Sequence, residues 1–241
     1  MSPEELVQQA CPRINTLGAA FYFAPATVAK GKDAGLDGFR FYVLGRGGPM
    51  GDCEASVVRA AFGYFSQSLV DKMWNSAREI MAPRDAGRLF DEAACEFGRA
   101  SFGELDLAAY CAAAGAINDA ADPTALTLYA AIDSEPLADD VPALAMQLTA
   151  RLREYRGSAH LAALRCVGLS DVAAHAMKRP DDMGMFGHEE APEIADVMHT
   201  QRVEAEALTD SMVMDAFSAV DADGAAALLA GLDAIEAALG G

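Results

Sequence analysis

The residues best suited to chemistry are three polar side chains on one stretch of the sequence, Arg153, Arg156 and His160. They are separated by three and four positions, so on an α-helix they would form a single row. A guanidinium group presents a planar fork of donors that matches a carboxylate, sulfate or phosphate. A histidine beside two cations resists gaining a third positive charge, and a neutral imidazole can accept a proton near pH 7. The row therefore predicts an anion-binding site with His160 as a general base.

The same stretch has the most regular helical period of the chain. Apolar residues recur at intervals of three or four positions, so they share one helix face, which we expect to be buried. Arg156 and His160 each follow a member of that face by four positions, which places them roughly 40° around the helix, at its border. The members of the face are Leu144, Leu148, Leu152, Tyr155, Ala159, Ala162, Cys166 and Leu169.

A purely structural role for the row is the alternative. Arg153 and Arg156 can pair with Glu154, with acids on a neighbouring helix or with carbonyl groups at a helix end. His160 would then be a border residue whose hydrogen bonds are satisfied within the fold. The pattern alone leaves both interpretations open.

A second candidate segment, GLDGFRFYVLGRGGPMGD, covers residues 35–52. Its apolar residues are bracketed by glycines and predict either a strand or a buried helix. Its glycine-rich end leads into a predicted long helix from Asp52 to about Met81, where the first amides could meet an anion beside Arg46. An ordinary structural turn capped by Asp52 is the other interpretation.

From these segments we assign a predicted site. The catalytic candidates are His160, Tyr42 and Glu154, and Asp52 and Asp171 are further possible carboxylate partners for His160 or His175. Packing in the core is the alternative role for the aromatic members. The predicted ligand-binding residues are Arg46, Arg153, Arg156, Tyr22, Tyr64 and Trp74.

Neither a metal nor a cofactor is expected. His160, His175, His188 and His199 do not follow the HExxH spacing that places two imidazoles on one helix face. The five cysteines are scattered and contain no CxxC pair, which favours reduced, mostly buried thiols over a disulfide framework or a zinc site.

The charge balance limits the partners. The chain has 36 acidic and 18 basic residues and a net charge of −18. Residues 181–241 contain fourteen acids and one base, Arg202, so this part opposes nucleic acids and anionic membranes. No apolar run reaches the roughly 18 residues of a membrane span, and the acidic start does not resemble a signal peptide, so we expect a cytoplasmic protein.

The elements that would position the site are helices. We expect an all-α, multi-helix bundle with two packed halves, residues 1–135 and 136–241, or a single compact domain made of both. Caps, prolines and period predict helices from Pro3 to about Phe23, from Pro83 to Phe97, from Asp122-Pro123, from Ser170 to Met177, from Pro192, and from Ala222 to Leu239.

Two segments, AAFYFAP with GFRFYVLGRGGPMG and LREYRGSAHLAALRCVGL, resemble a family of actinobacterial proteins labelled helix-turn-helix or SalK-like, with MarR-type regulators among the named relatives. The resemblance implies a winged helix in the C-terminal half. The corresponding stretch here, FGHEEAPEIADVMHTQRVEAEALTDSM, lacks the family's basic helix and wing signature, so we expect a degenerate winged helix. DNA is therefore not an expected partner.

Three functions follow. The leading hypothesis is a cofactor-independent enzyme of specialised metabolism, including antibiotic biosynthesis, which binds a small anionic metabolite and catalyses elimination or intramolecular ring closure. The second is a ligand-responsive helix-turn-helix regulator, and the third is a non-catalytic subunit of a heteromeric complex. Assembly as a homodimer, or with a small partner protein, is a further alternative. The regulator would need a basic face from Lys30, Lys32, Arg40, Arg59, Lys178 and Arg179.

Overall fold

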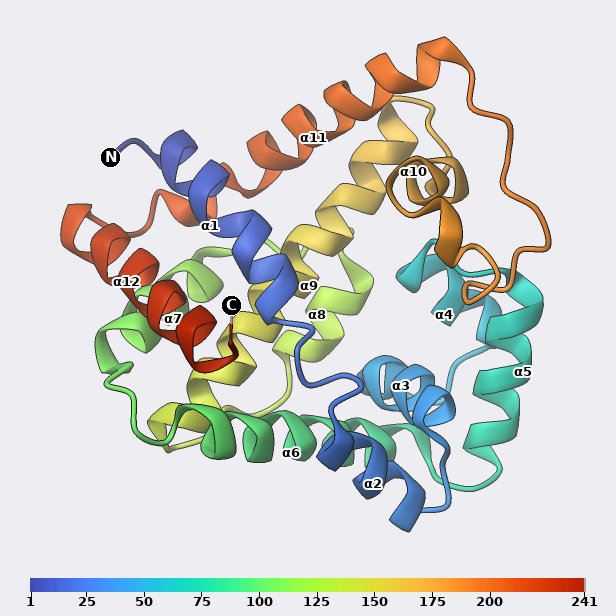
Figure 1. Ribbon diagram of the computed structural model, residues 1–241, viewed down its shortest axis with the longest axis horizontal. Helices are drawn as coiled ribbons and strands as arrows, with labels where there is room; N and C mark the ends of the chain where they lie inside the picture. The colour runs from blue at the N-terminus through green and yellow to red at the C-terminus, as the bar shows by residue number, and fades with distance from the viewer. Residues whose placement is uncertain (241) are drawn as a thin grey trace.

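The computed structural model describes residues 1–240, and its regular elements are helices joined by turns and loops (Figure 1). No strand occurs within this range, which confirms the predicted all-α multi-helix bundle. The α-helices are α1 (Pro3–Leu17), α2 (Pro25–Asp33), α3 (Gly38–Gly47), α4 (Ala55–Phe62), α5 (Gln67–Arg78), α6 (Pro83–Phe102), α7 (Ala108–Ala120), α8 (Thr127–Asp133), α9 (Val141–Cys166), α10 (Asp171–Lys178), α11 (Asp196–Phe217) and α12 (Ala222–Ala238), with 3-10 turns η1 (Gly48–Met50) and η2 (Pro180–Asp182).

Helix α9 is the central element and runs diagonally through the molecule (Figure 1). Asp140 caps it by accepting a hydrogen bond from the amide of Ala143, and α1, α6, α7 and α11 pack around it. The buried members of its predicted apolar face include Leu148, Leu152 and Tyr155. The long amphipathic helix expected from the period is therefore present.

The predicted burial of Cys166 is wrong, because this residue is exposed at the end of α9. The last turns of α9 extend beyond the main core and are covered on one side. There Leu164 packs with α10 and α11 in a small separate apolar cluster that includes Ala173 and Ala205. Cys166 lies on the uncovered side.

Helix α1 begins as predicted, with Ser2 and Glu5 forming a reciprocal capping box. It ends at Leu17 and not at Phe23. Gly18 lies against α9, where a Cβ atom on this glycine would come within 2.7 Å of the Thr149 carbonyl oxygen. The chain then continues through residues 18–23 as hydrogen-bonded turns.

Residues 35–52, for which the sequence predicts either a strand or a buried helix, form helix α3 followed by η1. Asp37 starts the helix by accepting hydrogen bonds from the amides of Phe39 and Arg40. Two glycines of this segment are points of close contact with α6: a Cβ atom on Gly45 would lie 2.6 Å from Cβ of Phe90, and one on Gly48 would lie 2.0 Å from the Pro83 carbonyl oxygen. The glycine-rich stretch is therefore a structural turn packed against α6.

The long helix predicted from Asp52 to Met81 is two helices, α4 and α5. Gly63 and Tyr64 between them both have positive φ, +63° and +59°, and interrupt the helical backbone. Asp52 caps neither helix and instead pairs with Arg78 at 3.3 Å. The helical period continued across this break because both helices bury apolar residues in the same core.

Three further boundaries differ from the sequence predictions. The Asp122-Pro123 pair begins a turn, and α8 starts only at Thr127. Helix α6 continues past Phe97 to Phe102. Pro192 lies in a non-helical connection, and α11 starts at Asp196.

The C-terminal elements include two predicted helices. Ser170 caps α10 by accepting from the Ala173 amide, and α12 begins at Ala222 after the Asp221 cap. The connection from α10 to α11 forms the outer arc in Figure 1. No strand follows α11 within residues 1–240, so the structure has no wing hairpin there.

One cluster of buried side chains extends from Leu6 in α1 to Ile235 in α12 and includes residues from both predicted halves. Helix α9 belongs to the second half but packs against α1 and α6 of the first. No helix of the described chain is long and apolar enough to cross a membrane.

Candidate functional site

A cavity of about 650 Å³ lies beside the second half of α9. Its walls come from the end of α1, from α3, from the α4–α5 turn, and from α10, α11 and the segment after α10. The polar and aromatic lining residues are Asn15, Thr16, Tyr42, Arg46, Phe62, Tyr64, Phe65, Arg153, Glu154, Arg156, Ser158, His160, His175, Lys178, Arg179, Phe186, Arg202 and Glu206. All three members of the α9 row, Arg153, Arg156 and His160, face this one space.

The charge of the cavity lining is opposite in sign to the net charge of the chain. It is lined by six of the 18 basic residues of the chain but by two of its 36 acidic residues, Glu154 and Glu206. A concentration of cations in a protein with a net charge of −18 attracts anions locally while the outer surface repels polyanions. The cavity is therefore suited to a small anion.

At one end of the cavity Glu154 is buried between two arginines. Its carboxylate pairs with Arg46 through two hydrogen bonds of 2.7 and 2.9 Å and accepts a third of 2.6 Å from Arg153. The hydroxyl of Tyr22 donates to the same carboxylate at 2.5 Å. Burial by itself would raise the pKa of Glu154, but the charges of Arg46 and Arg153 outweigh this effect and lower the pKa to about 2. Glu154 is therefore ionised at neutral pH and holds the two arginines in place.

Tyr42 lies one helical turn before Arg46 on α3. Its hydroxyl accepts a hydrogen bond of 3.1 Å from the Arg46 guanidinium, which also lies over the ring of Phe62 at 4.3 Å from the ring centre. The ring contact and the hydrogen bonds to Tyr42 and Glu154 together hold the guanidinium in place. Tyr42 and Arg46 thus form a rigid wall of the cavity, opposite α10 and α11.

Both arginines of the α9 row have internal partners, as the structural alternative expected. Arg153 donates to Glu154 and, through Nε, to the carbonyl of Asn15 near the end of α1, at 3.2 Å. Arg156 forms ion pairs of 2.9 and 2.7 Å with Glu206 and Asp210 of α11. Their charges are therefore largely compensated by the protein itself.

Three other cations of the cavity have no ion pair within the described chain: Lys178, Arg179 and Arg202. Lys178 is the last residue of α10, Arg179 follows it, and Arg202 lies on α11. Sequence reasoning missed this trio as a binding group because its members are distant in sequence from the α9 row. The one available signal was Arg202, the single base of an otherwise acidic segment.

The hydrogen bonds of His160 determine its tautomer. Its Nδ1 lies 2.9 Å from the hydroxyl oxygen of Thr209, and that hydroxyl donates its single proton to the carbonyl of Ala205 at 2.6 Å. Nδ1 must therefore carry the hydrogen of the neutral ring and donate it to Thr209. The lone pair is left on Nε2, which lies 3.9 Å from a Glu206 carboxylate oxygen.

The surroundings of His160 favour its neutral form. Burial lowers the pKa of His160. The carboxylate of Glu206 opposes the shift, whereas the positive charges of Arg156, Lys178 and Arg202 add to it. A neutral imidazole with a free Nε2 beside cations is the arrangement required of a general base acting on a bound anion.

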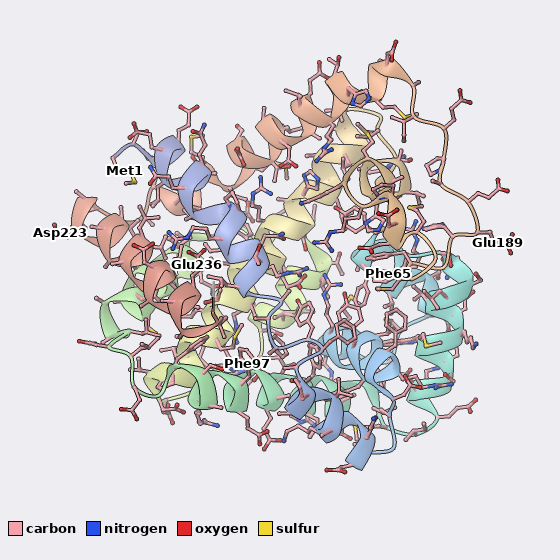
Figure 2. The ribbon with its side chains drawn as sticks, viewed as in Figure 1. Met1, Phe65, Phe97, Glu189, Asp223 and Glu236 are labelled. Carbon is pink, nitrogen blue, oxygen red and sulfur yellow. The ribbon has the colours of Figure 1, made fainter. Side chains whose placement is uncertain are left out.

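Aromatic side chains form the wall nearest the α4–α5 turn. The ring of His175 lies 3.9 Å from that of Phe186, which stacks on Phe65 at 4.4 Å, between centroids. In Figure 2 the labelled Phe65, which belongs to the α4–α5 turn, lies below α10 and beside α4. Sequence reasoning selected neither His175 nor Phe186 as a ligand contact. Phe186 lies in an irregular segment after α10, where no helical period of apolar residues marks a buried face.

Tyr64, a predicted ligand-binding residue, lines the cavity with a strained backbone. Its φ of +59° is rare for a residue with a side chain. Its amide donates to Asp171 of α10 at 2.8 Å, and its carbonyl accepts from His188 at 2.7 Å. These two contacts keep the strained turn against the cavity, as is common at functional sites.

Two predicted ligand-binding residues do not line the cavity. Trp74 is completely buried in the core, and its indole nitrogen donates to the carbonyl of Cys53 at 2.9 Å. Tyr22 lies behind Glu154, where it contacts the carboxylate and not the open space. Both aromatic rings are buried, as expected if these residues pack in the core. Each ring is mostly apolar, and its single polar group has a hydrogen-bond partner inside the protein.

The unsatisfied polar atoms of the interior also concentrate here. Three buried side-chain atoms lack a hydrogen-bond partner within the described residues: Nε of Arg156, Oγ of Ser158 and Nε2 of His175. All three residues line the cavity. Buried polar groups without partners are costly and uncommon, so their collection around one cavity is typical of a ligand site.

No cluster of three or more potential metal-binding side chains was found among residues 1–240. The five cysteines are all free, and three of them, Cys11, Cys95 and Cys111, are buried. The pKa of Cys11 is raised to about 12 by burial, so its thiol is not a nucleophile at neutral pH.

Comparison with known proteins gives one match. Residues 7–196 match a family described as a helix-turn-helix family. No curated protein and no solved structure matches the chain. The matched range covers most of the chain and includes α9, α10 and every other element of the cavity except α11. The chain therefore belongs to this helix-turn-helix family.

Proposed function

We propose that the protein binds a small organic anion in the cavity beside α9 and acts on it as a cofactor-independent enzyme. One observation supports this most directly: Lys178, Arg179 and Arg202 have no ion pair among residues 1–240 and line the same space as His160. An anionic group on the ligand would pair with the three cations, and its neighbouring atoms would meet the base.

The chemistry follows from these parts. In an elimination, the lone pair of His160 Nε2 takes a proton from carbon, the C–H electrons form a double bond, and the leaving group departs with its own electron pair. In a ring closure, His160 takes the proton of a ligand hydroxyl or amine, whose lone pair attacks a carbon and displaces the leaving group. A departing sulfate or phosphate would gain charge beside the cations, which stabilises the transition state.

The remaining predicted residues receive supporting roles. Arg46 and Tyr42 would form the opposite wall, and Glu154 would hold Arg46 and Arg153 in position. Arg156 has two carboxylate partners and would contact the ligand through exchange with one of them. The resemblance to actinobacterial SalK-like proteins supports a substrate from specialised metabolism.

Anion binding can be tested by thermal shift and calorimetry with phosphate, sulfate, acetate and methyl phosphate. We expect stabilisation of the wild type and at least a tenfold weaker affinity in a Lys178→Ala/Arg202→Gln variant. Lys72→Ala is the matched control, because Lys72 is an exposed lysine that has no ion pair within the described residues and lies outside the cavity. Equal affinity in all three proteins would refute the site.

A ligand-responsive regulator is the second candidate, and membership of a helix-turn-helix family favours it. Its proposed basic face is weakened by ion pairs, since Lys30 pairs with Glu92 and Glu96, and Arg59 pairs with Asp171. Arg40 is likewise paired, with Asp37. Helix α11 contains five acids and one base. These charges argue against phosphate contacts.

The two candidates separate in a DNA-binding assay on random duplexes over a range of salt, with size-exclusion measurement of the oligomeric state. An enzyme is expected to ignore DNA at about 0.15 M salt, where phosphate contacts by basic side chains still give measurable binding. A dimer that binds duplex DNA at this salt would favour the regulator. The non-catalytic subunit and the small partner protein stay predictions.

A further inference from the structure

A second cavity of about 550 Å³ lies next to the cationic one. Four residues line both spaces, Ala61 of α4, Leu128 of α8, and Ser158 and Leu161 of α9. The two cavities therefore meet along α9. The residues that line the second cavity alone are Val57, Arg59, Ala60, Gly63, Ala125, Leu126, Thr127, Ala162, Leu164, Arg165 and Asp171.

The second cavity differs from the first in chemistry. Most of its walls are aliphatic side chains of α4, α8 and α9. Two of its charged residues, Arg59 and Asp171, pair with each other at 2.9 Å, and Asp171 also accepts the Tyr64 amide. Arg165 is the one cation of the second cavity without an ion pair among residues 1–240, against three in the cationic cavity, so polarity falls along α9 from the first cavity to the second.

The boundary between the cavities includes a small side chain, Ala61, which lines both of them. Gly157 lines the cationic cavity alone, and a Cβ atom on it would meet nothing within 4 Å. Leu161 is held on one side because it packs on Gly63, where a Cβ atom would lie 2.3 Å from a Leu161 methyl carbon. The unpartnered hydroxyl of Ser158 lies at the same junction.

We propose that the ligand is an amphiphilic anion, with its charged group at Lys178, Arg179 and Arg202 and its apolar body across Ser158 and Leu161 in the second cavity. This inference rests on the proposed function of the cationic cavity and names its ligand class. The volumes of the two cavities, about 650 and 550 Å³, support this ligand class. A small-molecule site occupies about 300–1,000 Å³, and an inorganic anion would fill little of this space. Each methylene buried in the second cavity should tighten binding about fourfold.

The test uses n-alkyl phosphates from methyl to octyl, below their micellar concentrations, with calorimetric affinities for the intact chain. We expect the dissociation constant to fall with chain length from methyl to octyl phosphate, by tens-fold or more in total. The neutral analogue octanol should bind at least tenfold more weakly than octyl phosphate. Equal binding of octanol and octyl phosphate would overturn the proposal, because the cations would then contribute nothing.

A variant of the second cavity provides the structural control. Ala162→Trp fills a position that lines the second cavity and not the first. It should weaken octyl phosphate at least tenfold and leave methyl phosphate within twofold. Ala207→Trp, an exposed position on α11 outside both cavities, should change neither affinity.

The outcomes distinguish the two proposals. If methyl phosphate binds but affinity does not rise with chain length, or if Ala162→Trp weakens methyl and octyl phosphate equally, the amphiphilic ligand is refuted and the anion site stands. If no anion of any length stabilises the chain, the proposed function itself fails. Circular dichroism of each tryptophan variant identifies a loss of folding, and Ala162→Leu then replaces Ala162→Trp.

Discussion

Arg46 of α3 and Glu154 of α9 form a buried two-hydrogen-bond ion pair across 108 positions of sequence. Glu154 also accepts from Arg153, so one carboxylate compensates two guanidinium groups. The pair joins the first half of the chain to the central helix at the base of the cationic cavity. Its energetics give the first two predictions.

Removing Glu154 should be strongly destabilising. Glu154→Ala leaves two arginines without their shared carboxylate, and breaking a buried pair on one side costs roughly 3–5 kcal/mol. Replacing both partners, as in Arg46→Met/Glu154→Leu, should cost less than the single substitution, since one arginine, Arg153, and not two, is then left without its carboxylate partner. Urea unfolding followed by circular dichroism measures both values. A double variant less stable than Glu154→Ala would contradict this account.

The same carboxylate should contribute to acid denaturation. The pKa of Glu154 falls from 4.5 to about 2 on folding, so its contribution is complete above pH 5 and is lost as pH falls from about 4.5 through 2. A shift of this size corresponds to about 3 kcal/mol. We expect Glu154→Gln to lose less unfolding free energy than the wild type between pH 5 and pH 2.5, because the glutamine cannot titrate. Parallel curves for the two proteins would exclude Glu154 as a source of the pH dependence.

Thr209 should set the tautomer of His160. In Thr209→Val the Nδ1–H of His160 loses its acceptor, so the neutral ring should shift toward the Nε2–H form. Nitrogen-15 chemical shifts of the imidazole measure the two populations near pH 8. Thr149→Val is a matched control, because Thr149 also donates to the carbonyl four residues earlier but partners Tyr110, away from the cavity. A His160 spectrum unchanged by Thr209→Val would refute the assignment.

Two glycines should respond oppositely to alanine. Gly48→Ala would place a Cβ atom 2.0 Å from the Pro83 carbonyl oxygen, and backbone shifts of this kind cost about 1–3 kcal/mol. Gly157 is inside α9 with open space around it, so Gly157→Ala should stabilise the protein by roughly 0.5–1 kcal/mol through helix propensity. Thermal unfolding compares the two variants directly. A neutral Gly48→Ala would mean that η1 and α6 separate without cost.

The sequence by itself determined most of the helices. Capping at Ser2 and Ser170 and the apolar period of α9 depend on residues within one or two turns, so local spacing is sufficient to identify them. The same spacing placed Arg153, Arg156 and His160 in one row, and all three line one cavity. Where glycines intervened, at Gly18 and Gly63, the predicted ends were wrong, because a neighbouring helix or a positive φ decides those positions.

Only the tertiary structure decided which charges are free. Arg156 has an ideal position on α9, yet Glu206 and Asp210, 50 and 54 positions away, compensate its charge. Arg202 is an isolated base in an acidic segment, and in the part of the chain that the structure describes it lines the cavity without an ion pair. An ion pair depends on the approach of side chains across packed helices within about 4 Å, and a period of 3.6 residues carries no information about which distant helix supplies the partner.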